Sequence, residues 1–146
     1  MIMGLFNKKK TIQPDNSSAI QEAENAIKIL QESSEILQNT TNSDVFFSRL
    51  KMFHKAINTL DVLSNQVSLT VNPEEMQAAF EKDKQEMIYS FIVRAYNKVW
   101  DEANQLKTEA GKKRKFQQFF DDIEPYRPYM NEKNNQYLKY KWKQSV

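Results

Sequence analysis

The two residue types that most strongly interrupt helices are scarce in this chain. Only two glycines and four prolines occur among 146 residues. Because turns and helix ends draw heavily on both residue types, this scarcity favours long helices and argues against an all-β fold. The length suits one domain with a sizeable core. We therefore predict an all-α fold: a single-domain bundle of about five helices over residues 15–146, with a long central third helix.

Apolar residues recur at helical spacing through the first half of the chain. One stripe steps by three and four residues, and a second stripe repeats the same rhythm after the polar break "QNTTNSD". The pattern predicts helices over 15–38 and 43–65, and the short connection between them predicts an antiparallel hairpin. The first stripe is Ile20, Ala23, Ile27, Leu30, Ser34 and Leu37, and the second is Phe46, Leu50, Phe53, Ile57 and Leu60.

The segment "NPEE" is the clearest local start signal for a helix. Asn72 can accept hydrogen bonds from the first backbone N–H groups, and Pro73 suits the first helical position, where no N–H is needed. The apolar pattern that follows predicts a third helix over 73–110. Gly111 is placed to end this helix in the left-handed conformation.

The last third of the chain predicts two shorter helices, over 113–124 and 131–143. "EPYRPYM" separates them, because closely spaced prolines cannot sit inside an α-helix, and Asn131 can cap the second helix. Near the end, "LKYKWK" alternates apolar or aromatic residues with lysines. A strand there would need a neighbouring strand, which the sequence does not offer, so we interpret the segment as a terminal helix docked by its aromatic residues.

Four stretches, "NSDVFFSRL", "FIVRAYNK", "LKTEAGKKRKFQQFFDDIEPY" and "MNEKNNQYL", resemble small helical proteins of low-GC Gram-positive bacteria and their phages. The resemblance covers roughly residues 20–140. It implies a helical fold and a phage or mobile-element context, and it transfers no catalytic or binding residue.

Charge is distributed unevenly along the chain. Residues 1–14 carry three lysines and no acid, residues 15–111 have a balance of −6, and residues 112–146 a balance of +5. We expect residues 1–14 to be a disordered basic arm, with a weak membrane-surface anchor as the alternative. No apolar run approaches the ~20 residues of a membrane span. Together with the absence of cysteine, this predicts a cytoplasmic protein without a membrane span.

Most catalytic chemistry lacks its usual residues. There is no cysteine, and His54 is the only histidine, without the partners of a metal site or a triad. Two isolated glycines make no phosphate-binding loop. The carboxylates of "FFDDIEPY" are better interpreted as a solvated helix end than as a hydrolase pair. The sequence therefore predicts no catalytic residue, no metal and no cofactor, and a protein that is not an enzyme.

Two functions stay open. The leading hypothesis is a protein-binding or adaptor protein with an unidentified protein partner, which includes a second copy of the chain as a homodimer. The alternative is a nucleic-acid-binding accessory protein, because lysines can neutralise phosphates and exposed aromatic rings can stack on single-stranded bases. The candidate polyanion-binding residues are Lys112, Lys113, Arg114, Lys115, Arg127, Lys139, Lys141, Lys143, Tyr140 and Trp142.

Overall fold

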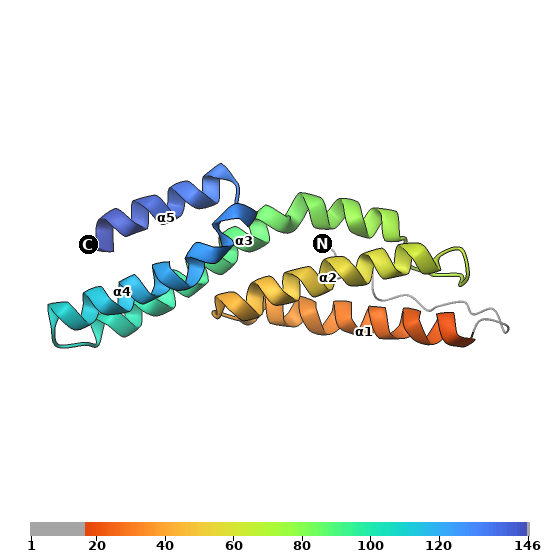
Figure 1. The fold of residues 1–146 in the computed structure, drawn as a ribbon, viewed down its shortest axis with the longest axis horizontal. Coiled ribbons are helices and arrows are strands. Elements are labelled where there is room, and N and C mark those ends of the chain that lie inside the picture. Colours follow the sequence, from red (N-terminus) through yellow and green to blue (C-terminus); the bar gives the residue numbers. More distant parts are fainter. Residues whose placement is uncertain (1–16, 146) are drawn as a thin grey trace. The chain divides into compact units, whose positions relative to one another are not determined.

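The computed structural model describes residues 17–145, and helices account for almost all of them (Figure 1). No β-strand occurs within this range, and none of its helices is long and apolar enough to cross a membrane. The predicted all-α fold with a long third helix is confirmed. The predicted arm over 1–14 lies outside the described residues. The elements are α1 (Ser17–Asn39), α2 (Ser43–Leu63), α3 (Pro73–Asn104), α4 (Glu109–Ile123), the 3-10 helix η2 (Glu124–Tyr129) and α5 (Glu132–Ser145).

Asparagine side chains cap three of these helices. The Oδ1 atoms of Asn42, Asn72 and Asn131 each accept a hydrogen bond from a backbone N–H two or three residues further on, at 2.9–3.0 Å. Each bond satisfies a donor that the helix itself cannot pair. The caps place the starts of α2, α3 and α5 within a residue of their predicted positions. The prolines also end α4 as predicted, although the chain continues as η2.

The connection between α3 and α4 differs from the prediction. The third helix ends at Asn104 instead of residue 110, and α4 begins at Glu109 instead of residue 113. Gly111 does not end a helix, because no described residue has a positive φ. Gly111 lies in the first turn of α4, where its N–H donates to Thr108 Oγ1 at 3.0 Å. The threonine cap, which the sequence analysis overlooked, therefore starts a new helix at the point where glycine was expected to stop the old one.

The described chain divides into two compact units. Unit 1 comprises residues 17–39 and 48–84, and unit 2 comprises residues 40–47 and 85–145. Both α2 and α3 therefore contribute to each unit. Glutamate and aspartate outnumber lysine and arginine in unit 1, whereas basic residues outnumber acidic residues in unit 2.

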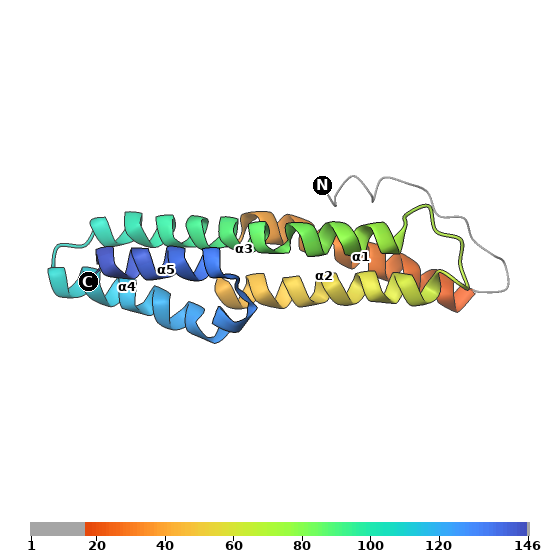
Figure 2. The same ribbon diagram turned by 90° about the horizontal axis from the view of Figure 1, so that it is seen from above.

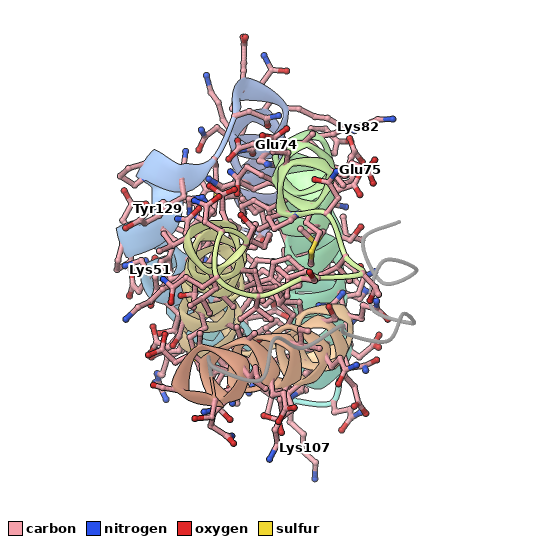
Figure 3. The ribbon with its side chains drawn as sticks, turned by 90° about the vertical axis from the view of Figure 1, so that its right-hand side faces the viewer. Lys51, Glu74, Glu75, Lys82, Lys107 and Tyr129 are labelled. Atoms are coloured by element: carbon pink, nitrogen blue, oxygen red, sulfur yellow. The ribbon has the colours of Figure 1, made fainter. Side chains whose placement is uncertain are left out.

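Unit 1 packs α1 with the longer part of α2 and the first part of α3. Phe53 and Phe80 are buried against each other, with ring centroids 5.6 Å apart. On α1, small side chains such as Ala23 and Ala26 are buried, whereas Ile20 and Ile27 are only half-buried. The predicted stripe is therefore buried at Ala23, Leu30, Ser34 and Leu37 but only half-buried at both isoleucines, because the contact face of α1 is centred on the small residues beside them. Charged side chains, including Lys51, Glu75 and Lys82, project from the surface of this unit (Figure 3).

Unit 2 packs the second part of α3 with α4, α5 and the first turn of α2. Ile88, Phe91 and Ile92 of α3 are fully buried, and Phe91 stacks on Phe46 with centroids 4.4 Å apart. Figures 1 and 2 show that α4 runs back along this part of α3 and that α5 then runs in the opposite direction to α4. This arrangement packs the apolar and aromatic side chains of α4 and α5 against α3.

Candidate functional site

Aromatic rings hold α4 and α5 against α3. Tyr96 of α3 is 2% exposed, and its ring contacts those of Phe116, Phe119 and Phe120 at centroid distances of 5.6–6.4 Å. Its hydroxyl group is hydrogen-bonded to the Oγ atom of Ser145, near the end of α5, at 2.8 Å. Aromatic pairs of this kind stabilise a core beyond their buried area alone. The phenylalanines of α4 therefore fill the core, and their side chains are not available to stack on bases.

Polar side chains fix the turn that leads into α5. Gln85 of α3 donates from Nε2 to the carbonyl oxygen of Tyr129 at 3.1 Å. Its Oε1 accepts from the backbone N–H of Asn131 at 3.0 Å and from Nδ2 of Asn134 at 2.8 Å. Asn134 is fully buried, so its amide group depends on this partner. One glutamine therefore positions the first turn of α5.

Half of the predicted polyanion-binding residues are engaged within unit 2. Lys112 pairs with Glu109 at 3.5 Å and Lys115 with Glu102 at 3.7 Å. Arg127 pairs with Glu124 at 3.6 Å and donates from Nε to Asn135. Lys112, Lys115 and Arg127 therefore lie against neighbouring carboxylates. These carboxylates compete with an external anion for the three basic side chains. The pairs are solvent-accessible, and such pairs are worth about 0–1 kcal/mol.

Lys141 and Trp142 are directed towards other rings of unit 2. The Nζ atom of Lys141 lies over the rings of Tyr96 and Tyr137, at 5.3 and 5.6 Å from their centroids, a cation–π arrangement. Burial raises the pKa of Tyr137 to about 12, with further increases from its tyrosine neighbours. Trp142 is half-buried and meets Phe120 edge to face at 5.0 Å. Lys141 and Trp142 therefore help to dock α5. Docking by aromatic residues was predicted for "LKYKWK", whereas the contact of Lys141 with the tyrosine rings was not.

The remaining candidates face solvent. Lys113, Arg114, Lys139 and Lys143 are exposed, and none of them makes an ion pair within residues 17–145. Tyr140 is 60% exposed. Its hydroxyl accepts a hydrogen bond from Nε2 of Gln144 at 3.0 Å, and Lys141 lies over its ring, so only the four charged side chains make no such contact within residues 17–145.

A groove of about 650 Å³ runs between α4 and α5. Phe120, Leu138 and Trp142 line its apolar floor. Asp121, Glu132 and Lys139 also line this groove. Sequence analysis found the basic side of this groove but missed the acidic side. The signal was present in the spacing, because Glu132 and Lys139 are seven residues apart and therefore fall on one face of α5.

A second cavity, of about 280 Å³, lies in unit 2 between the start of α2 and helices α3 and α4. Its polar side chains pair with one another. Lys98 donates to Thr41 Oγ1 at 3.3 Å, and Ser43 Oγ donates to the carbonyl oxygen of Asp122 at 3.3 Å. Asp122 lines this cavity, whereas Asp121 lines the groove between α4 and α5. The two adjacent carboxylates therefore do not meet in one pocket.

His54 lies in unit 1. Its ring stacks on Phe80 at 5.3 Å, with an interplanar angle of 5°, and its Nε2 is 3.2 Å from Nε2 of Gln77. Within residues 17–145, no group of three or more histidine, aspartate or glutamate side chains is arranged to hold a metal ion. We take the groove between α4 and α5 as the candidate site, because its apolar floor is bordered by charges of both signs.

Comparisons of the chain with protein-family models, with curated proteins and with solved structures found no match.

Proposed function

We propose that the chain is a protein-binding protein and that its partner docks on the outer face of α4 and α5. The observation that supports this proposal most directly is the composition of that face. It combines the exposed ring of Tyr140 and the half-buried ring of Trp142 with charges that have no ion-pair partner among the described residues. Tyrosine and tryptophan at the centre of a patch with a polar rim are typical of protein interfaces.

The groove provides a further reason to favour a protein partner. A polyanion is attracted by a continuous basic track, but here Asp121 and Glu132 line the same groove as Lys139. Charges of both signs on one surface suit a partner that carries charges of both signs. Complementary charges of this kind determine the orientation and the specificity of a complex more than its affinity.

Site-specific photocrosslinking in the cell tests the proposal. A photoreactive benzoylphenylalanine replaces Tyr140 in one version of the chain and Val62 of α2 in a matched control, since both positions are well exposed, at 60% and 68%. We expect a discrete protein adduct from position 140 and none from position 62. The adduct should be lost when Lys139→Glu and Lys143→Glu are added. The same adducts from both positions, or none from position 140, would count against the proposal.

Nucleic-acid binding is the second candidate, because Lys113, Arg114, Lys139 and Lys143 are all exposed. This function predicts that a labelled single-stranded oligonucleotide binds at low salt and is released as salt rises. Neutralising Lys113 and Arg114 should weaken binding more than neutralising Lys112 and Lys115, which pair with Glu109 and Glu102. Fluorescence anisotropy measures both effects. An oligonucleotide that fails to bind at low salt would exclude this candidate.

A further inference from the structure

The cavity between the start of α2 and helices α3 and α4 has an apolar floor. Its volume of about 280 Å³ is close to the lower limit of about 300 Å³ for ligand pockets in proteins. Val99 of α3, which is half-buried, lines the cavity, and so do the buried side chains of Phe91, Ala95, Phe119 and Ile123. Transfer of an apolar group from water onto such a floor is favourable. The floor can therefore hold the apolar part of a small molecule.

An ion pair borders one end of the cavity. The Nζ atom of Lys115 on α4 lies 3.7 Å from Oε1 of Glu102 on α3, and both residues line the cavity. Ser43, at the start of α2, borders the other end, where its Oγ donates to the carbonyl oxygen of Asp122 at 3.3 Å. Lys115 and Asp122 are seven residues apart on α4, so the cavity is about 10 Å long. A molecule of the size of an amino acid fits this length.

Charges of both signs border the end of the cavity at α2. Lys98 is exposed, and its Nζ donates to Oγ1 of Thr41, a bond that uses one of the three donors of the ammonium group. Asp44 and Asp122 are also exposed, and each accepts a hydrogen bond from a neutral side chain. None of these three charged groups has an ion-pair partner within residues 17–145. This end of the cavity can therefore bind a carboxylate group through Lys98 and an ammonium group through an aspartate.

We propose that this cavity binds a small zwitterion with an apolar body, of the chemical class of the free apolar amino acids. The carboxylate group of the ligand accepts hydrogen bonds from Nζ of Lys98, and its ammonium group donates to the carboxylate of Asp122. Its apolar side chain then lies on the floor, over Val99 and Phe119. Among the described residues, none that lines this cavity also lines the groove between α4 and α5, so the inference goes beyond the proposed function and does not depend on it.

A zwitterion matches this end of the cavity better than an ion of one sign. A simple amine would bring its positive charge near Lys98, and a simple carboxylate would bring its negative charge near Asp44 and Asp122, so each would meet a like charge. Because the charged groups of the rim are exposed, each ion pair with the ligand should strengthen binding by no more than about fivefold. The dissociation constant should be on the order of 1 mM for so small a ligand, and binding should weaken as salt rises.

Leucine and two analogues that each lack one of its charges test the proposal on the full chain. The analogue 3-methylbutylamine lacks the carboxylate group, and 4-methylpentanoate lacks the ammonium group. Titrations followed by the amide chemical shifts of the protein give a dissociation constant for each compound. We expect leucine to shift the amide signals of Ser43 and Val99 in a saturable manner and to bind about threefold to fivefold more tightly than either analogue. Shifts that do not saturate, or analogues that bind as tightly as leucine, would overturn the inference.

Single substitutions on the rim test the role of each charge. Lys98→Gln should weaken the binding of leucine about threefold to fivefold without weakening that of 3-methylbutylamine. Asp122→Asn should weaken the binding of leucine to a similar extent without weakening that of 4-methylpentanoate. The matched control is Asp121→Asn, which removes the adjacent carboxylate in the other groove and should leave the binding of leucine unchanged. All three residues are exposed, so circular dichroism should show unchanged helicity. Equal weakening by Asp121→Asn and Asp122→Asn would contradict a site in this cavity.

Discussion

The buried amide of Asn134 makes the turn before α5 sensitive to a single side chain of α3. Gln85→Leu keeps a similar side-chain volume but removes both hydrogen-bonding atoms of the amide. Two exposed backbone groups, the carbonyl of Tyr129 and the N–H of Asn131, can then bond to water. The Nδ2 of Asn134 cannot do so, because Asn134 is fully buried and keeps only a 3.4 Å contact with the carbonyl oxygen of residue 85.

The magnitude follows from this difference in exposure. Losing the two exposed hydrogen bonds costs about 0.5–1.5 kcal/mol in total, because water replaces them. Leaving the buried amide of Asn134 without its best partner costs about 1–3 kcal/mol. Gln85→Leu should therefore destabilise unit 2 by about 2–4 kcal/mol. Adding Asn134→Leu removes this buried amide group. The Oδ1 of Asn134 has no hydrogen-bond partner in the structure, so replacing this residue gives up little else. The double variant should be about 1–2 kcal/mol more stable than Gln85→Leu alone.

Tryptophan fluorescence during urea titration measures this effect where it occurs. Trp100 and Trp142 are the only tryptophans of the chain, and both lie in unit 2 with Gln85 and Asn134. The exposed Gln117 provides a control, since its amide donates only to Asp121 and Gln117→Leu should change stability by less than about 0.5 kcal/mol. If the double variant is as unstable as the sum of the two single variants, the hydrogen-bond reasoning is wrong.

Three further predictions concern unit 2. Gly111→Ala should leave the free energy of unfolding in urea nearly unchanged in the wild-type background. When Thr108→Ala is also present, Gly111→Ala should raise this free energy by about 0.5–1 kcal/mol. The reason is that a Cβ atom at position 111 would lie 2.8 Å from the capping Oγ1 of Thr108. Burial raises the pKa of Tyr137 from 10 to about 12, so the folded state resists ionisation and stability should fall as pH rises from 10 to 12. Tyr137→Phe should flatten that fall in urea titrations across this pH range. Lys141→Gln should cost about 1 kcal/mol because Lys141 lies over tyrosine rings, whereas Lys139→Gln, at an exposed position, should cost almost nothing in the same titration.

Capping residues were the most reliable local predictors of this fold. Asn72 and Asn131 cap α3 and α5 as their sequence context indicates, because an asparagine side chain needs only the backbone of its own first turn. Gly111 was misinterpreted for a related reason. A glycine can end one helix or sit in the first turn of the next, and Thr108, three residues earlier, decides between these outcomes. The prediction gave weight to the glycine and none to the threonine.

The candidate site was only half predictable. Counting basic and aromatic residues identified the C-terminal region, but it could not separate Lys141, which lies over tyrosine rings, from Lys139, which faces solvent. Two residues apart on a helix, these lysines point in directions about 200° apart, and only the position of α3 determines which of them meets the core. The acidic side of the groove was missed because Asp121 and Glu132 come from different helices.

The sequence by itself determined the helices, since the rhythm of apolar side chains, the scarcity of helix breakers and the local caps all act within a few residues along the chain. The tertiary structure decided which faces of those helices are buried, as the half-buried Ile27 and the fully buried Ala23 of α1 illustrate. It also decided that α5 runs antiparallel to α4, which brings Asp121, Glu132 and Lys139 to one groove. The physical reason is that hydrogen bonds along a helix are local, whereas burial and the arrangement of charge depend on residues that meet only after the chain has folded.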